Sequence, residues 1–143
     1  MADLYYTSSV RTNANVYQAE LEELHQILQT RNLTTFEYRA CERSLQISIE
    51  VAIGIAKHWV KATKGAPPAD AYQSFETLSQ HGAISLEQLT NWRKVIGLRN
   101  ALVHDYLNID PAIVRSVISN RYYQDIFNFI ETGLTELEKN NKH

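Results

Sequence analysis

The sequence predicts an all-α fold, an up-and-down helical bundle of about five helices. Apolar residues recur at helical spacing along most of the chain. Glycine (5) and proline (3) are scarce among the 143 residues, which leaves few turns for a β fold of many strands. Several capping patterns also mark where helices begin. We therefore expect a single domain over residues 1–143, which is long enough to bury one hydrophobic core.

Residues 1–12 are mostly polar and are expected to form an N-terminal tail. The first expected helix covers residues 17–28, where aromatic and aliphatic residues follow helical spacing. Thr34 and Glu37 form a capping-box pattern, which satisfies free backbone donors at a helix start. A second helix then runs from about residue 35 to about residue 63. Its middle, LQISIEVAIGI, also alternates like a strand, but the run is far longer than a usual strand.

This long helix carries apolar residues on two stripes. Leu45 and Ile49 belong to one stripe, and Val51 and Ile55 belong to the other. A helix that is apolar over so much of its surface lies at the centre of its bundle or is shared with a second subunit.

Asp70 is expected to cap a short third helix over residues 71–80. Ser85 with Gln88 gives another capping box, which opens a fourth helix.

The last expected helix follows Asp110 and Pro111, a pair that favours a helix start because Asp caps and Pro fits the first turn. It extends from residue 112 to about residue 139. Residues 138–143 are expected to form a frayed C-terminus.

Composition excludes several classes of function. A net charge of −2 and a pI near 6.2 argue against a protein that coats nucleic acid through bulk electrostatics, but they allow a small basic site. The single cysteine, Cys41, cannot form an internal disulfide or a thiolate zinc site. No signal peptide is recognisable, and no stretch approaches the roughly 18 apolar residues of a membrane span. We expect a cytoplasmic protein that contacts no membrane and needs no cofactor.

The stretch RNALVHDY, residues 99–106, places three hydrogen-bonding side chains in a segment rich in Leu and Val: Arg99, His104 and Tyr106. On a helical wheel, Asn100 falls about 100° from Arg99 and His104 about 140° from it. Asn100 and His104 therefore form an i,i+4 pair, and Arg93 lies near the same line. The arc is so wide that these side chains cannot all reach one substrate atom from a single straight helix. The side chains would meet if the helix bends or if two copies of the chain face each other across a two-fold axis.

Each of these residues also has a structural interpretation. An arginine in a helix most often forms an ion pair, and Glu42 and Glu50 on the long helix are available partners for Arg99. A lone histidine is usually solvated, and a lone tyrosine is usually half-buried with a hydrogen-bonded hydroxyl.

The motif resembles that of a known family. An R-x4-H pattern with Asn directly after Arg and x-Y after His, the long helix ERSLQISIEVAIGIAKHWV and the exit YLNIDP resemble the HEPN superfamily. The resemblance is strongest to the HepT toxins of HEPN/MNT nucleotidyltransferase toxin–antitoxin modules, and it covers nearly the whole chain. It implies a homodimeric, metal-independent endoribonuclease whose composite site lies in the dimer cleft.

The chemistry of the motif residues suits that activity. RNA cleavage without a metal requires a base for the ribose 2′-OH, an acid for the leaving 5′-oxygen and positive charge beside the phosphorane. His104 is suited to acid or base work, and Arg99 forks onto phosphate oxygens. Asn100 can orient a neighbour but cannot carry the proton.

The resemblance gives Tyr106 a separate role. In HepT-like systems the matching tyrosine receives AMP from the cognate MNT-family nucleotidyltransferase antitoxin, which silences the toxin. An anionic group beside Arg99 and His104 would occupy the position of the RNA phosphate. The substrate class of the family is RNA, including tRNA.

Five further basic residues are candidate phosphate contacts. Lys57 and Lys61 lie at the basic end of the long helix, which is either a solvated face or an RNA-contacting patch. Arg93 is a further candidate RNA contact. Arg39 and Arg43 would either form dimer salt bridges or hold phosphates.

Two alternatives remain open from the sequence. The first is a non-catalytic HEPN subunit that binds nucleotide or substrate for a nucleotidyltransferase. The second is a helical adaptor without a ligand, which predicts that Arg99 pairs with a carboxylate and that His104 faces away from any concavity.

Overall fold

The computed structural model describes residues 4–64, 70–104 and 109–140, and in these ranges it contains six α-helices and no strand. The predicted all-α class is confirmed, with one helix more than expected. None of the helices in these ranges combines the length and the apolar content that crossing a bilayer requires. The helices are α1 (Leu4–Leu28), α2 (Thr35–Lys64), α3 (Ala71–Gln80), α4 (Leu86–Val103), α5 (Pro111–Ser119) and α6 (Gln124–Asn140).

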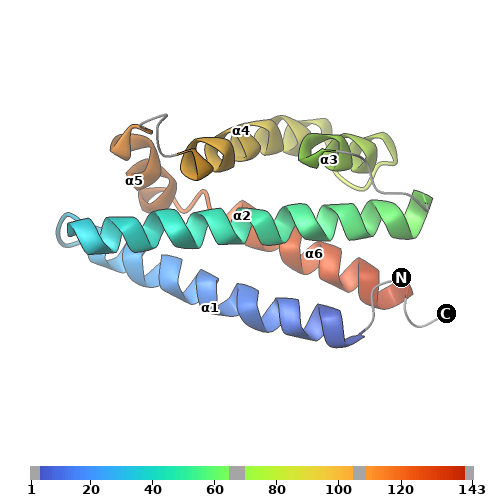
Figure 1. The fold of residues 1–143 in the computed structure, drawn as a ribbon, viewed down its shortest axis with the longest axis horizontal. Helices are drawn as coiled ribbons and strands as arrows, with labels where there is room; N and C mark the ends of the chain where they lie inside the picture. Colours follow the sequence, from blue (N-terminus) through green and yellow to red (C-terminus); the bar gives the residue numbers. More distant parts are fainter. Residues whose placement is uncertain (1–3, 65–69, 105–108, 141–143) are drawn as a thin grey trace.

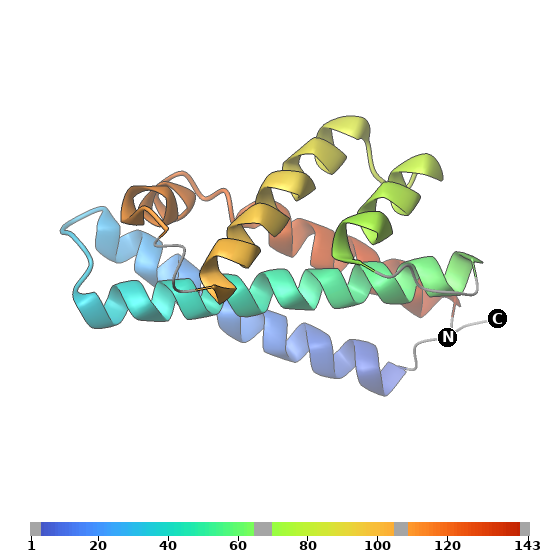
Figure 2. The ribbon, with the colours of Figure 1, turned by 45° about the horizontal axis from the view of Figure 1, so that its top comes forward.

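Three long helices lie side by side along the molecule (Figure 1). Helix α2 contacts both α1 and α6, which also contact each other. Helices α3 and α4 form a hairpin that rests on another side of α2, and the C-terminal end of α4 descends onto the middle of α2 (Figure 2). Helix α5 contacts α1 beyond the end of this hairpin. Helix α2 therefore packs against four other helices, which are α1, α3, α4 and α6.

The predicted starts of α2, α3, α4 and α5 are confirmed. At the start of α2, the Thr34 backbone N–H donates to Glu37 Oε1 over 2.8 Å, and the Glu37 N–H donates to Thr34 Oγ1 over 3.1 Å. Ser85 and Gln88 form the same reciprocal pair at the start of α4. The remaining predicted caps accept from the first turns of α3 and α5; they are Asp70 and Asp110.

The expected N-terminal tail over residues 1–12 is wrong, because α1 begins at Leu4. Thr7 is fully buried, and Arg11 binds two carboxylates of α6. Its Nε lies 3.0 Å from Glu131 and its Nη1 lies 2.7 Å from Glu138. The expected frayed C-terminus is wrong for residues 138–140, since α6 continues through Glu138 to Asn140, and residues 141–143 lie outside the described part of the chain. Polar residues here serve contacts between helices, so their polarity did not signal a tail.

The single terminal helix expected after Pro111 is also wrong, because it breaks into α5 and α6. Arg121 adopts φ 54°, a left-handed conformation that no helix continues through. The break buries Tyr123 completely and leaves Tyr122 59% exposed. Glu22 of α1 fixes the turn, accepting from the Tyr123 hydroxyl at 2.5 Å and pairing with Arg121 at 3.3 Å.

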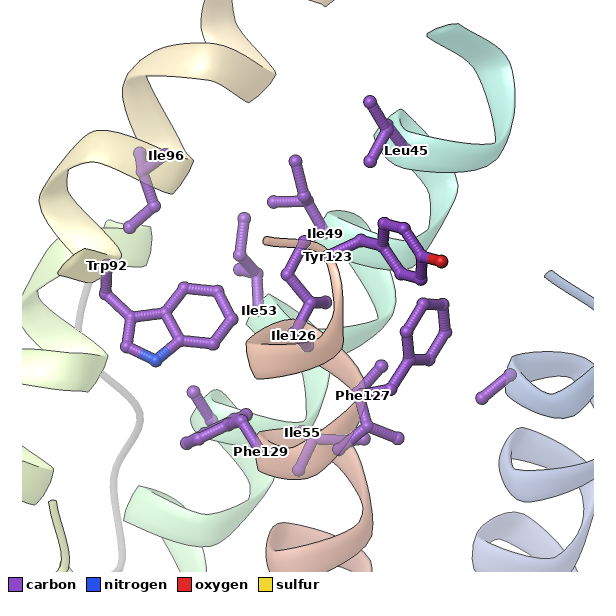
Figure 3. Packing of buried hydrophobic residues seen from close by; sticks show 14 of the residues in the cluster. Leu45, Ile49, Ile53, Ile55, Trp92, Ile96, Tyr123, Ile126, Phe127 and Phe129 are labelled. Atoms are coloured by element: carbon purple, nitrogen blue, oxygen red, sulfur yellow. The ribbon is translucent and has the colours of Figure 1, made fainter. Parts of the chain in front are cut away.

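An aromatic cluster joins the α3–α4 hairpin to the rest of the core. Phe75 and Trp92 stack with centroids 4.2 Å apart, and Trp92 meets Phe129 of α6 edge-on at 5.0 Å. Figure 3 shows Ile53 of α2 converging with Trp92 and Phe129. The α2 stripe that contains Leu45 is fully or almost fully buried, which confirms that face of the helix as core.

Gly133 of α6 is required by this packing, whereas Gly54 of α2 is not. A Cβ at Gly133 would lie 2.4 Å from Ile55 Cγ2, a methyl group of a fully buried β-branched side chain that cannot swing away. We expect Gly133→Ala to lower the free energy of unfolding in urea by about 1–3 kcal/mol.

Gly54→Ala is the matched control, because a Cβ at Gly54 meets nothing within 4 Å in the chain. We expect it to leave the stability unchanged or to raise it by up to about 1 kcal/mol, the usual gain from replacing a helical glycine. Equal stability of the two variants would contradict the α2–α6 packing described here.

Cys41 is a buried core residue. It is 0% exposed, and burial, followed by the charge of Glu42, raises the pKa of its thiol to about 12. We expect a thiol reagent at mildly alkaline pH to leave the folded protein unlabelled and to label the urea-unfolded protein fully. Rapid labelling of the folded protein would contradict the burial of Cys41.

Candidate functional site

Arg99 occupies the side of α4 that faces α2. Its neighbours on this side, Trp92, Ile96 and Leu102, are buried, and the Arg99 side chain itself is only 24% exposed. The guanidinium reaches α2, where Nη1 donates to Glu50 Oε1 over 2.9 Å. Of the two partners considered from the sequence, Glu42 and Glu50, the structure selects Glu50.

The Arg99 guanidinium is not saturated by this contact. Glu50 takes one of its donors, and Nε is buried with no hydrogen-bond partner within the described part of the chain. Nη2 also has no hydrogen-bond partner among the described residues, so this guanidinium retains capacity for a further acceptor. Arginine donors match the geometry of phosphate oxygens.

Asn100 and His104 lie on a different side of α4 from Arg99, and both are exposed. His104 is the C-cap of α4, with φ −100° and ψ 83°, and its backbone N–H donates to the Asn100 carbonyl over 3.1 Å. The helix thus ends one residue before His104. The wide arc read from the helical wheel is therefore real in a single chain: Arg99 faces α2 and Asn100 faces solvent.

Tyr106, the expected modification site, lies outside the described residues, so the structure does not place it. Arg93 is exposed on α4, with its guanidinium 5.1 Å from the centre of the Tyr72 ring. Lys57 is half-buried and Lys61 exposed, both on α2 beyond Glu50 toward its C-terminus. The three candidate RNA contacts are thus spread over two helices.

A shallow groove lies on the α1–α2 face beside Glu50. Its volume is about 430 Å³, and the residues that line it come from both helices. Helical spacing predicted the apolar stripe here but not the groove, since its shape depends on how α1 crosses α2. The lining residues are Tyr6, Val10, Arg43, Gln46, Ile47, Glu50, Val51 and Gly54.

Another cavity, of about 700 Å³, lies between the N-terminal half of α4 and the start of α6. Asn91 and Asn128 are among its lining residues, but no residue of the R-x4-H motif is. We therefore place the candidate site at the other end of α4, where the motif residues are.

No three His, Cys, Asp or Glu side chains in the described ranges gather in a way that could hold a metal ion. The candidate site consists instead of one guanidinium, one carboxylate, one amide and one imidazole.

The ion pair between Arg99 and Glu50 is one of the two features that the adaptor alternative predicted. It is a single-point contact between partly exposed groups, and such pairs contribute about 0–1 kcal/mol. A phosphate can therefore compete for the same guanidinium. The pair alone does not decide between an adaptor and a phosphate-binding site.

Comparison with known proteins decides the family. The family described as Ribonuclease HepT-like matches residues 17–132. The mRNA nuclease HepT of Shewanella oneidensis is 33% identical over 88 residues, 62% of this chain and 65% of that protein. The tRNA nuclease HepT of Aphanizomenon flos-aquae is 31% identical over 104 residues, 72% of this chain and 71% of that protein. The alignment with the Shewanella protein thus spans just under two thirds of that relative.

Two solved structures share the fold. The tri-AMPylated HEPN toxin of Shewanella oneidensis in complex with MNT antitoxin matches with a TM-score of 0.73 and 24% identity, covering 92% of this chain and 97% of that one. A toxin–antitoxin complex with AMP-PNP matches with a TM-score of 0.69 and 23% identity, covering 87% and 96%. The sequence match over residues 17–132 includes the whole of α4 with its Arg99–His104 motif, and the chain belongs to the ribonuclease HepT-like family.

Proposed function

We propose that this protein is a metal-independent endoribonuclease, the toxin of a HEPN/MNT toxin–antitoxin system. The observation that carries the proposal is that a chain of the HepT-like family presents Arg99, Asn100 and His104 together at the last turn and C-cap of α4. Two relatives are named as nucleases, one of mRNA and one of tRNA, which supports RNA as the substrate class.

Each motif residue has a role that its chemistry allows. Arg99 holds the scissile phosphate and stabilises the extra charge of the phosphorane, because its fork stays protonated at any working pH. His104 exchanges the proton, and Asn100 orients His104 or the phosphate. The candidate contacts Arg93, Lys57 and Lys61 would hold RNA farther from the cut, where sequence-independent backbone contacts suffice.

The site is proposed to be completed in a homodimer. In one chain Arg99 and Asn100 face different sides of α4, so a second copy across a two-fold axis supplies the missing direction. Ile47 and Val51 of α2 are only half-buried, and Val103 at the end of α4 is 44% exposed. These apolar side chains border the motif and would be covered by the second copy.

The toxin is proposed to be silenced when a cognate MNT-family nucleotidyltransferase transfers AMP to Tyr106. The matching solved structure holds a HEPN toxin that carries AMP groups and an MNT antitoxin, which supports this form of control. Tyr106 is two residues from His104 in the sequence. An AMP phosphate there would compete with RNA for Arg99 by charge and by volume.

We expect the unmodified dimer to cleave RNA in EDTA and to leave 2′,3′-cyclic phosphate ends. His104→Ala and Arg99→Ala should each lower kcat by about 10²-fold or more, because each removes a transition-state interaction. Cleavage is measured on end-labelled tRNA and mRNA, with the product ends identified by mass spectrometry.

His81→Ala is the matched control for His104→Ala, since His81 is the exposed C-cap of α3 as His104 is of α4. Arg31→Ala is the matched control for Arg99→Ala, because Arg31 also forms an ion pair with a glutamate. Both controls should cleave at the wild-type rate. A folded dimer that binds nucleotide but cuts no RNA would establish the non-catalytic subunit instead.

For regulation, we expect incubation with the cognate nucleotidyltransferase and ATP to add AMP to the wild-type protein and to abolish cleavage. Tyr106→Phe should keep nuclease activity but accept no AMP and escape inhibition, because the phenol oxygen is the acceptor. Intact-mass spectrometry measures the addition. Tyr122→Phe, which removes an exposed tyrosine hydroxyl elsewhere, should behave like the wild type, and AMP addition to Tyr106→Phe would place the acceptor at another residue.

A further inference from the structure

The proposed reaction needs two proton transfers at each bound phosphate, and each copy of the motif supplies one described proton carrier. The 2′-OH must lose a proton as it attacks, and the 5′-oxygen must gain one as it leaves. His104 can perform one of these transfers at a time. The Asn100 amide cannot accept or give up a proton at working pH, and Arg99 keeps its proton there. The chemistry therefore calls for a second titratable group within reach of the phosphate held by Arg99.

Glu50 is the carboxylate that contacts the phosphate-binding arginine. Its Oε1 lies 2.9 Å from Arg99 Nη1, so a phosphate oxygen bound by the same guanidinium would lie beside it. Its side chain is 46% exposed, and its second oxygen, Oε2, accepts no hydrogen bond in the part of the chain that the structure describes. Glu50 thus has a carboxylate oxygen that makes no contact in the described part of the chain.

The groove of about 430 Å³ gives a ribose room to approach this oxygen. Glu50 lines the groove, and Gly54, one turn further along α2, leaves its floor without a side chain. Arg43, also in the lining, is exposed and has no carboxylate partner among the described residues. Its charge offsets the repulsion between Glu50 and an RNA phosphate.

His104 lies on a different side of α4 from Arg99 in the same chain. In the proposed homodimer, the imidazole that meets the 5′-oxygen of a phosphate bound by Arg99 is therefore His104 of the second copy, and the 2′-oxygen lies on the side of Glu50.

We propose that Glu50 is the general base of the reaction and that His104 is the general acid. This inference rests on the ribonuclease function proposed above. Glu50 takes the proton as the 2′-O–H bond breaks and the 2′-oxygen bonds to phosphorus. The P–O5′ bond breaks, and the leaving oxygen takes the proton of the His104 imidazolium. The products are a 2′,3′-cyclic phosphate and a 5′-OH, and both side chains return to their starting states by proton exchange with water.

A substrate that needs no acid separates the two roles. RNA with a bridging sulfur in place of the 5′-oxygen has a leaving thiolate that departs without protonation. Glu50→Gln, Glu50→Asp and His104→Ala are assayed on this substrate and on ordinary RNA, beside Glu136→Gln as a control that removes a carboxylate of another ion pair. Binding is measured separately with 2′-O-methyl RNA, which cannot be cut.

On ordinary RNA, we expect Glu50→Gln and His104→Ala to lower kcat by about 10²–10⁴-fold, with Glu50→Asp between them and the wild type. On the sulfur substrate, His104→Ala should return to within about tenfold of the wild type, and Glu50→Gln should stay impaired by the same factor as before. Glu136→Gln should match the wild type on both substrates.

Glutamine keeps an oxygen that accepts from Arg99, so a purely positioning role for Glu50 predicts little loss in Glu50→Gln. An almost unchanged kcat in Glu50→Gln would overturn the assignment of Glu50 as the base. A loss confined to the binding of 2′-O-methyl RNA would also overturn it. So would a sulfur substrate that restores the rate of Glu50→Gln and not that of His104→Ala. Wild-type cleavage with an active Glu50→Gln variant overturns only this inference. Absence of wild-type cleavage overturns the proposed function, and the assignment with it.

Discussion

Helix α2 runs through the centre of the bundle, and α1, α3, α4 and α6 all pack against it. Its buried stripe, which includes Leu45, Ile49 and Ala56, is closed on every side by these neighbours. Each contact fixes one helix relative to the same 30-residue axis. The direction in which the end of α4 meets α2 is set by this packing, together with the stack of Trp92 on Phe75 and its edge-on contact with Phe129. The position of the motif therefore depends on core packing more than on its own polar contacts.

Where α4 meets α2, Arg99 and Glu50 form the ion pair of the candidate site. Both groups retain access to water, so the pair contributes little to stability and is open to competition. Such a pair holds a guanidinium in place without neutralising all its donors. In the proposed reaction, a phosphate would meet an oriented arginine with a carboxylate at its side, which is an arrangement suited to proton transfer next to a bound anion.

Much of the architecture follows from local sequence rules. The capping boxes at Thr34 and Ser85, the aspartate caps and the length of the apolar run in α2 each predicted an element that the structure contains. The rules failed where tertiary contacts override local preference. Arg11 keeps a polar N-terminal segment helical by binding two carboxylates of α6, and Glu22 holds the turn at Arg121 that divides the terminal helix.

The sequence by itself determined the all-α class, the caps and the motif residues Arg99, Asn100 and His104, because these depend on spacing and on residue chemistry. Only the tertiary structure decided which glutamate meets Arg99, which face of α4 Asn100 occupies, and that a groove opens beside Glu50. Glu42 and Glu50 are eight residues apart and are equivalent candidates in sequence. The crossing of α4 over α2 brings Glu50, not Glu42, to Arg99, and this crossing is fixed by the packing of Trp92 against Phe129, which lies 37 residues further along the chain.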